Sequence, residues 1–113
     1  MILDATNKSV TIKLNGTITT NQLPVIVNYT DYGIGNLPKT ECFETDNTND
    51  VTIVSSPGSE ITRLIMLINI YNRDSVDATV NIKYVIDGNN FIWRKATLTS
   101  GSSLIYSRGI WYY

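Results

Sequence analysis

The side chains that most often carry enzyme chemistry are scarce in this sequence. It contains no histidine and one cysteine, Cys42. Histidine is the commonest general base near neutral pH and the usual partner that activates a nucleophilic serine or cysteine. We therefore interpret Cys42 as a structural residue that cannot form a disulfide within the chain. The sequence predicts a protein that is not an enzyme and that uses no cofactor.

An acidic segment has part of the spacing of a calcium-binding loop. Asp46, Thr48 and Asp50 alternate as the first ligands of such a loop do. The sixth position is Val51, where the loop needs glycine, and the twelfth is Pro57, where it needs a bidentate glutamate. We interpret the segment as a polar surface loop that holds calcium at most weakly, and we predict no metal site.

Two pairs of nearby carboxylates have the residue types of a glycosidase acid and base. The pairs are Asp74 with Asp77 and Glu41 with Glu44. Nothing beyond their proximity supports that chemistry, and Asp74 stands in a predicted turn, where aspartate commonly bonds nearby backbone. The segment Gly33-Ile34-Gly35 lacks the third glycine of a dinucleotide-binding loop, so we interpret it as a turn.

Aromatic residues could bind sugars, because flat rings stack on the apolar faces of sugar rings. The candidates for such a surface are Tyr29, Tyr32, Trp111 and Tyr113. Aromatic side chains are more often buried in a core or an interface, and we favour that interpretation for most of them. A host glycan is therefore the alternative ligand rather than the leading one.

The composition is typical of an all-β protein that binds neither nucleic acid nor membrane. β-branched and aromatic residues are abundant, while strong helix formers are scarce. Nine basic and ten acidic side chains give a formal net charge of −1, so no basic surface for nucleic acid is indicated. The first residues show no signal-peptide pattern, and the apolar segment 61–71 is too short to span a bilayer. We expect synthesis in a reducing cytoplasm.

The first 30 residues predict a hairpin that extends as an arm. Residues 8–14 alternate between apolar and polar, and Asn15-Gly16 is the dipeptide preferred in two-residue hairpin turns. Residues 17–19 would form the return strand. Residues 31–50 show little periodicity and contain Pro38, so we expect a loop there.

Residues 51–113 predict the body of the domain, an antiparallel β-sandwich with jelly-roll-like topology. Strand patterns recur at short spacing with turn residues between them. Residues 78–86 alternate without a fault, and Asp87-Gly88 predicts a hairpin turn after them. Gly109 predicts another turn near the C-terminus. The whole chain has the length of one domain.

The segment from Ile61 to Tyr71 is apolar on both faces of its predicted strand. Such a strand needs cover on both sides, and in a chain of 113 residues a second copy can supply one of them. We predict that the uncovered face is an oligomer interface that contains Ile61, Arg63, Ile65 and Leu67.

The order of motifs in the second half resembles that of a set of small virion proteins of tailed bacteriophages. The resemblance is carried by Ile70-Tyr71-Asn72-Arg73-Asp74, Asp87-Gly88, Leu104-Ile105-Tyr106, and Gly109 before Trp111. The opening residues 3–6 and 20–25 also look like the N-terminal segment of these proteins. The resemblance covers both ends of the chain and leaves residues 31–50 unmatched.

The resemblance implies a β-sandwich component of a virion. Such proteins decorate capsids or form parts of head fibres, necks and tails, commonly as trimers. We therefore expect a homotrimeric capsid decoration or head-associated protein that contacts the major capsid protein or other virion proteins. The alternative is a fibre or tail accessory module that binds a host glycan. The resemblance supplies no catalytic residues.

Overall fold

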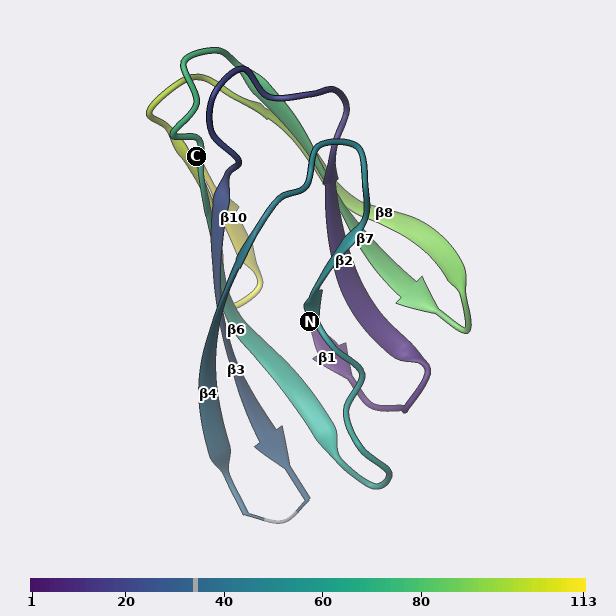
Figure 1. The fold of residues 1–113 in the computed structure, drawn as a ribbon. Coiled ribbons are helices and arrows are strands. Elements are labelled where there is room, and N and C mark those ends of the chain that lie inside the picture. Colours follow the sequence, from purple (N-terminus) through teal and green to yellow (C-terminus); the bar gives the residue numbers. More distant parts are fainter. Residues whose placement is uncertain (34) are drawn as a thin grey trace.

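The computed structural model describes residues 1–33 and 35–113, which form ten strands and no helix. The strands build two antiparallel sheets that pack face to face (Figure 1). Ile34, in the middle of Gly33-Ile34-Gly35, lies outside the described residues. The strands are β1 (Ile2–Leu3), β2 (Lys8–Leu14), β3 (Pro24–Tyr32), β4 (Leu37–Glu44), β5 (Val51–Val54), β6 (Thr62–Tyr71), β7 (Ala78–Ile86), β8 (Asn89–Leu98), β9 (Ser103–Ser107) and β10 (Ile110–Tyr112).

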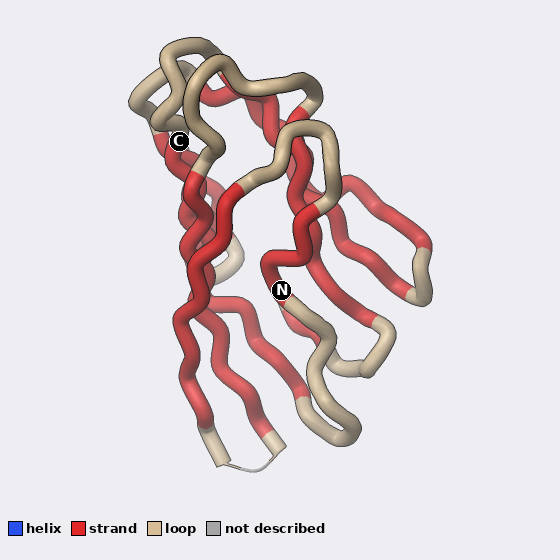
Figure 2. The backbone as a smooth tube through the Cα atoms, in the orientation of Figure 1, coloured by secondary structure: helices blue, strands red, loops and turns tan. Residues whose placement is uncertain are grey.

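The two sheets differ in size. The six-stranded sheet has the order β10-β9-β6-β3-β4, and the short β1 pairs with the same edge of β6 as β9 does. The four-stranded sheet has the order β5-β2-β7-β8. Figure 2 shows that nearly all of the regular structure is strand and that loops join the two layers at their ends. The expected all-β antiparallel sandwich is confirmed.

The core fills the space between the two sheets. Ile12 and Ile82 reach it from the four-stranded sheet, while Val27, Ile68 and Leu104 reach it from the six-stranded sheet. All five side chains are fully buried. Burying one such side chain stabilises the fold by about 1.5–3 kcal/mol. The alternation seen in the sequence therefore reports which face of each strand turns inward.

The expected N-terminal hairpin does not form. β2 pairs with β7 along its whole length and with β5 on its other edge, whereas residues 17–19 belong to no strand. The pairing of β2 with β7 continues beyond Leu14, because the backbone N–H of Asn15 donates to Thr79 O. The chain then crosses to the other sheet instead of turning back along β2. β2 and β3 thus lie within the two sheets, and residues 1–30 form no separate arm.

One carboxylate holds the crossing segment in place. Asp74 accepts hydrogen bonds from the backbone N–H groups of Thr19, Thr20 and Asn21 and from the Thr20 hydroxyl, at 2.8–3.2 Å. These donors favour the ionised form and hold the pKa of Asp74 well below its usual value. The hydrogen bonds of Asp74 therefore serve the fold, and Asp74 and Asp77 both line an open hollow beside the crossing segment.

The prediction of a loop over residues 31–50 is wrong for residues 31–32, which end β3, and for residues 37–44. Residues 37–44 form β4, which pairs with β3 over eight positions. β4 is an edge strand, and most of its side chains are exposed. Because few of its side chains are buried, β4 lacks the alternation of apolar and polar residues that predicts a strand.

Two expected turns are present. Asp87-Gly88 connects β7 to β8, and Arg108-Gly109 connects β9 to β10. Both residues of each pair have positive φ angles, between 49° and 87°. This is the backbone of the tight hairpin turns for which glycine at the second position is preferred.

Candidate functional site

A β-bulge in β6 decides which of its side chains face outward. β3 pairs Tyr29 with Ile65 and Asn28 with Leu67, so that Met66 has no partner opposite it. The extra residue shifts the alternation by one position. Arg63 and Ile65 point into the sandwich before the bulge, and Ile68 and Ile70 do so after it. Leu64 and Leu67 consequently face outward.

The outer surface of the six-stranded sheet combines large apolar side chains with small polar ones, among them Asn28, Thr40, Asn69 and Ser107. We define the apolar face as the outward side chains Ile2, Ile26, Leu64, Leu67, Tyr71, Ile105, Ile110 and Tyr112, which the strand register places on one side. These side chains are half-buried or exposed, and Ile110 and Tyr112 are 55% and 52% exposed. Contiguous exposed apolar surface of this kind marks an interaction site more often than chance exposure.

The outward positions of this sheet carry almost no charge. Among the outward residues described on β3, β4, β6, β9 and β10, only Glu44 is charged, and it pairs with Arg73 at 2.7 Å in one corner. Two outward asparagines, Asn28 and Asn69, have buried side-chain oxygens with no hydrogen-bond partner among the described residues. Buried polar atoms are usually paired. Thr11, on the outer side of the four-stranded sheet, also has such an atom, so it is the scarcity of charge that distinguishes the six-stranded face.

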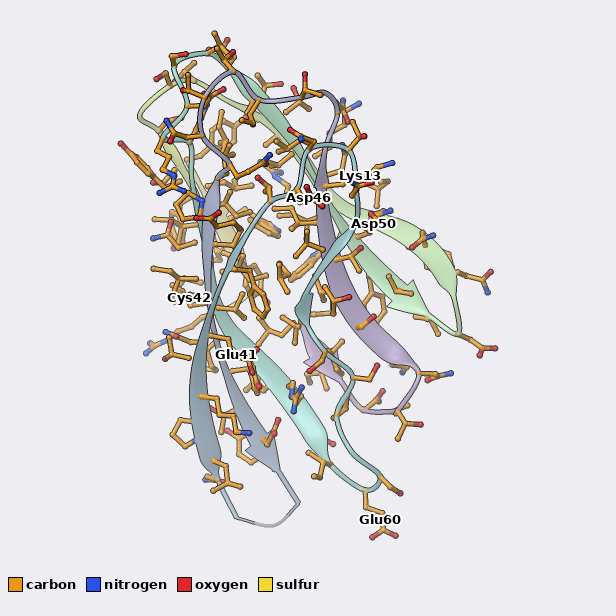
Figure 3. The ribbon with its side chains drawn as sticks, viewed as in Figure 1. Lys13, Glu41, Cys42, Asp46, Asp50 and Glu60 are labelled. Atoms are coloured by element: carbon orange, nitrogen blue, oxygen red, sulfur yellow. The ribbon has the colours of Figure 1, made fainter. Side chains whose placement is uncertain are left out.

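The outer surface of the four-stranded sheet is different. Lys13 and Lys95 lie there among threonines, Lys83 and Asn81 are buried on the same side, and Ile92 is 60% exposed near the edge. Lys83 pairs with Asp50 at 2.7 Å. In Figure 3, Lys13 and Asp50 lie over this sheet, on the far side of the molecule from Cys42 of β4. The two sides of the sandwich thus offer distinct surfaces to a partner.

The predicted oligomer interface is partly wrong. Arg63 and Ile65 are only 8% and 1% exposed, because the sandwich itself covers them. Their side of β6 faces the core, since the bulge at Met66 reverses the alternation that the prediction assumed. Leu67 belongs to the apolar face. Ile61 is half-buried just before β6, and its role in an interface stays a prediction.

Arg63 is the centre of a buried ion-pair network. Its guanidinium donates to both carboxylate oxygens of Asp31, at 2.8 and 3.0 Å, and to Ser55. It also lies 4.2 Å from the ring centroid of Tyr29. The hydroxyl of Tyr29 donates to Glu41 at 2.6 Å. Burial, together with this bond to a carboxylate, raises the pKa of Tyr29 to about 12.

The predicted ligand aromatics do not form one platform. Tyr29 is buried beneath Arg63, and Tyr32 lies at the far end of β3 with 40% exposure. Trp111 packs edge to face against Trp93, with ring centroids 5.1 Å apart. Tyr113 is 75% exposed at the C-terminus. Sugar stacking needs free, neighbouring ring faces, and these four residues do not share one.

The acidic side chains of the described residues do not cluster. Within the described part of the chain, no three acidic or cysteine side chains gather to hold a metal ion. Asp50 of the acidic segment is engaged by Lys83, which removes one of the calcium ligands considered. No described helix is long and apolar enough to cross a membrane.

Of the eight members of the apolar face, the predicted interface contained only Leu67 and missed Ile2, Ile26, Leu64, Tyr71, Ile105, Ile110 and Tyr112. A signal for Ile26 and Ile105 was present in the sequence. Val25 to Val27 and Leu104 to Tyr106 are uninterrupted apolar runs, so each must turn an apolar side chain away from the core. The sequence could not show that these outward residues join β6 on one surface, because that depends on the strand order.

Comparisons with protein-family models, with curated proteins and with solved structures found no match to this chain.

Proposed function

We propose that this chain is a structural protein of a tailed-bacteriophage virion. In this proposal it works as a homotrimer, decorates the capsid or another part of the head, and acts through protein–protein contacts without catalysis. The motif order described above supports the virion setting. The apolar face supports a role in contact, because its surface chemistry suits burial against protein.

The observation that carries the proposal is the extent of the apolar face. The five adjacent strands hold 3, 5, 10, 9 and 8 residues, and at about 4.8 Å spacing and about 3.3 Å rise per residue they give a sheet of roughly 550 Å² before side-chain relief is counted. A stable interface buries about 800 Å² of accessible surface on each partner. The outer side of the sheet can therefore supply most of one such interface.

Glycan binding is the alternative function, and the structure gives it less support. Trp93, Tyr106 and Trp111 pack against one another with centroids 4.9–5.1 Å apart, which uses the ring surfaces that a sugar would need. The exposed Tyr32 and Tyr113 lie on different parts of the sheet. A glycan array with densely displayed protein would revive this alternative if it gave a specific signal.

Mass spectrometry of purified virions from the phage that encodes the chain tests the proposal. We expect the protein in a fixed copy number relative to the major capsid protein, and antibody labelling at the particle surface. Particles that lack the protein, while infected cells contain it, would refute the virion role. Light scattering of the isolated protein tests the homotrimer separately.

A further inference from the structure

We infer that the apolar face is covered by further copies of this chain, and that β6 lies along the symmetry axis that relates them. In this arrangement, the β3–β4 half of one copy's face packs against the β9–β10 half of the next. The inference rests on the self-association in the proposed function and adds the surface, the partner and the direction of the axis.

Charge is the first argument for a like partner. The outward positions of the sheet are neutral except for Glu44, which Arg73 already pairs. A neutral apolar surface gives no electrostatic means of selecting a charged partner. The same surface buries against itself without placing like charges together. Closed symmetric assemblies of identical chains meet this requirement directly.

Shape is the second argument, because the two halves of the face differ. The β3–β4 half contains an open hollow of about 400 Å³ between β3, β4 and Met66, with Lys39 among its lining residues. The other half has its own open hollow of about 330 Å³, lined by Ile2, Leu64 and Arg108 among others, while the exposed side chains of Ile110 and Tyr112 project from β10 at the edge. A hollow over β3 and β4 and projecting side chains on β10 favour packing of these two edges against each other.

The strand register places these features at the same level along the sheet. Thr40, Asn28, Leu67, Ser107 and Ile110 are successive partners across the five strands. Thr40 and Asn28 line the hollow, and Ile110 projects from the other end of the same row. Rotation about an axis parallel to β6 keeps each row of residues at the same height along the strands. Ile110 of one copy therefore meets the hollow of the next. An axis across the strands would instead place β4 against β4.

Cys42 allows a direct test, because it is the only cysteine and faces outward on β4. Cys42, Ile26, Asn69, Ile105 and Tyr112 form another row across the sheet. Within one chain, Cys42 and Tyr112 are four strand spacings apart, about 19 Å. A disulfide needs Cα atoms about 4.4–6.8 Å apart, so any bond between these positions joins two chains.

The experiment is oxidation of the full-length Tyr112→Cys variant, followed by non-reducing electrophoresis. We expect covalent linkage between Cys42 of one copy and the introduced thiol of the next, which would produce a closed covalent trimer for a threefold axis. Ile105→Cys, in the same row, provides a second variant if Tyr112→Cys does not fold. Thr97→Cys, on the exposed outer side of the four-stranded sheet, is the matched control and should stay unlinked.

Two results would overturn the inference. An oligomer that forms no link in either row variant, by oxidation or with a bis-maleimide that spans the roughly 10 Å between stacked sheets, would show that another surface joins the copies. Rapid linkage of the unsubstituted protein through Cys42 alone would show β4 against β4, and therefore an axis across the strands. Neither result bears on whether the protein is present in virions, so failure of the inference is distinguishable from failure of the proposed function.

Discussion

Each sheet of this sandwich turns one side away from the core, and the two outward sides differ in their side chains. On the four-stranded sheet, lysines and threonines cover the strands with polar groups, and Lys83 is paired with Asp50. On the six-stranded sheet, the outward side chains of β6 and its neighbours are apolar and nearly uncharged. A monomer would gain nothing from the second arrangement, because exposed apolar strands promote unwanted association. This difference is the basis of the proposal that other protein covers the six-stranded sheet.

The largest expected effect is the difference between aspartate substitutions at Ile65 and Leu67, two nearby residues of β6. Ile65→Asp should prevent folding, because it buries an unpaired charge at a cost of about 5 kcal/mol, comparable with the whole stability of a small domain. Leu67→Asp should leave a folded monomer, because its charge faces outward. Circular dichroism and light scattering measure the two outcomes. Thr97→Asp is the control and should preserve both fold and assembly. A fully assembled Leu67→Asp protein would place the interface elsewhere.

Removing a single projecting side chain should weaken assembly without abolishing it. Ile110→Ala should raise the dissociation constant about tenfold, which corresponds to about 1.4 kcal/mol. Ile92→Ala removes an equally exposed isoleucine from the edge of the four-stranded sheet and should change nothing; the two side chains are 55% and 60% exposed. Sedimentation equilibrium measures both constants. Equal weakening by the two substitutions would remove the distinction between the surfaces.

The inner side of the six-stranded sheet should respond to alkaline pH. The pKa of Tyr29 is raised from 10 to about 12 in the folded protein, so the unfolded state loses this proton first as pH rises. The contribution of Tyr29 to stability is therefore complete below pH 10 and is lost as pH rises towards 12. Tyr29→Phe should make the free energy of unfolding less dependent on pH in this window. Chemical denaturation at several pH values provides the measurement, and an unchanged slope would contradict the assignment.

The smallest expected effect is that of salt. Because the apolar face is nearly uncharged, its self-association should change less than about threefold between roughly 0.05 and 1 M NaCl, conditions that strongly screen exposed ion pairs. Sedimentation equilibrium at both concentrations tests this. A steep decrease in association with salt would mean that charged groups, and therefore a different surface, hold the copies together.

The sequence predicted the fold class and most of the core because alternation is a direct consequence of burial. Val10, Ile12 and Leu14 alternate strictly, and all three are buried. The turns at Gly88 and Gly109 were predictable for a similar reason, since their backbone conformation selects glycine. These features are local, because each depends on only a few neighbouring residues.

Features that depend on partners far away in the chain were not predictable. Asn15-Gly16 suggested a hairpin, but pairing of β2 with β7, more than sixty residues away, decided the path instead. The bulge at Met66 arises from the register between β3 and β6, and it alone turned Ile65 inward and Leu64 outward. The candidate site was therefore assigned to the correct strand, with the correct phase at Leu67 and the wrong phase before the bulge.

Light scattering of the purified full-length protein, together with its Leu67→Asp variant, tests the central claim most directly. We predict a molar mass three times that of the single chain for the unsubstituted protein and a folded monomer for the variant. An unsubstituted protein that is monomeric at every concentration would contradict the claim that its apolar face exists to be covered by further copies.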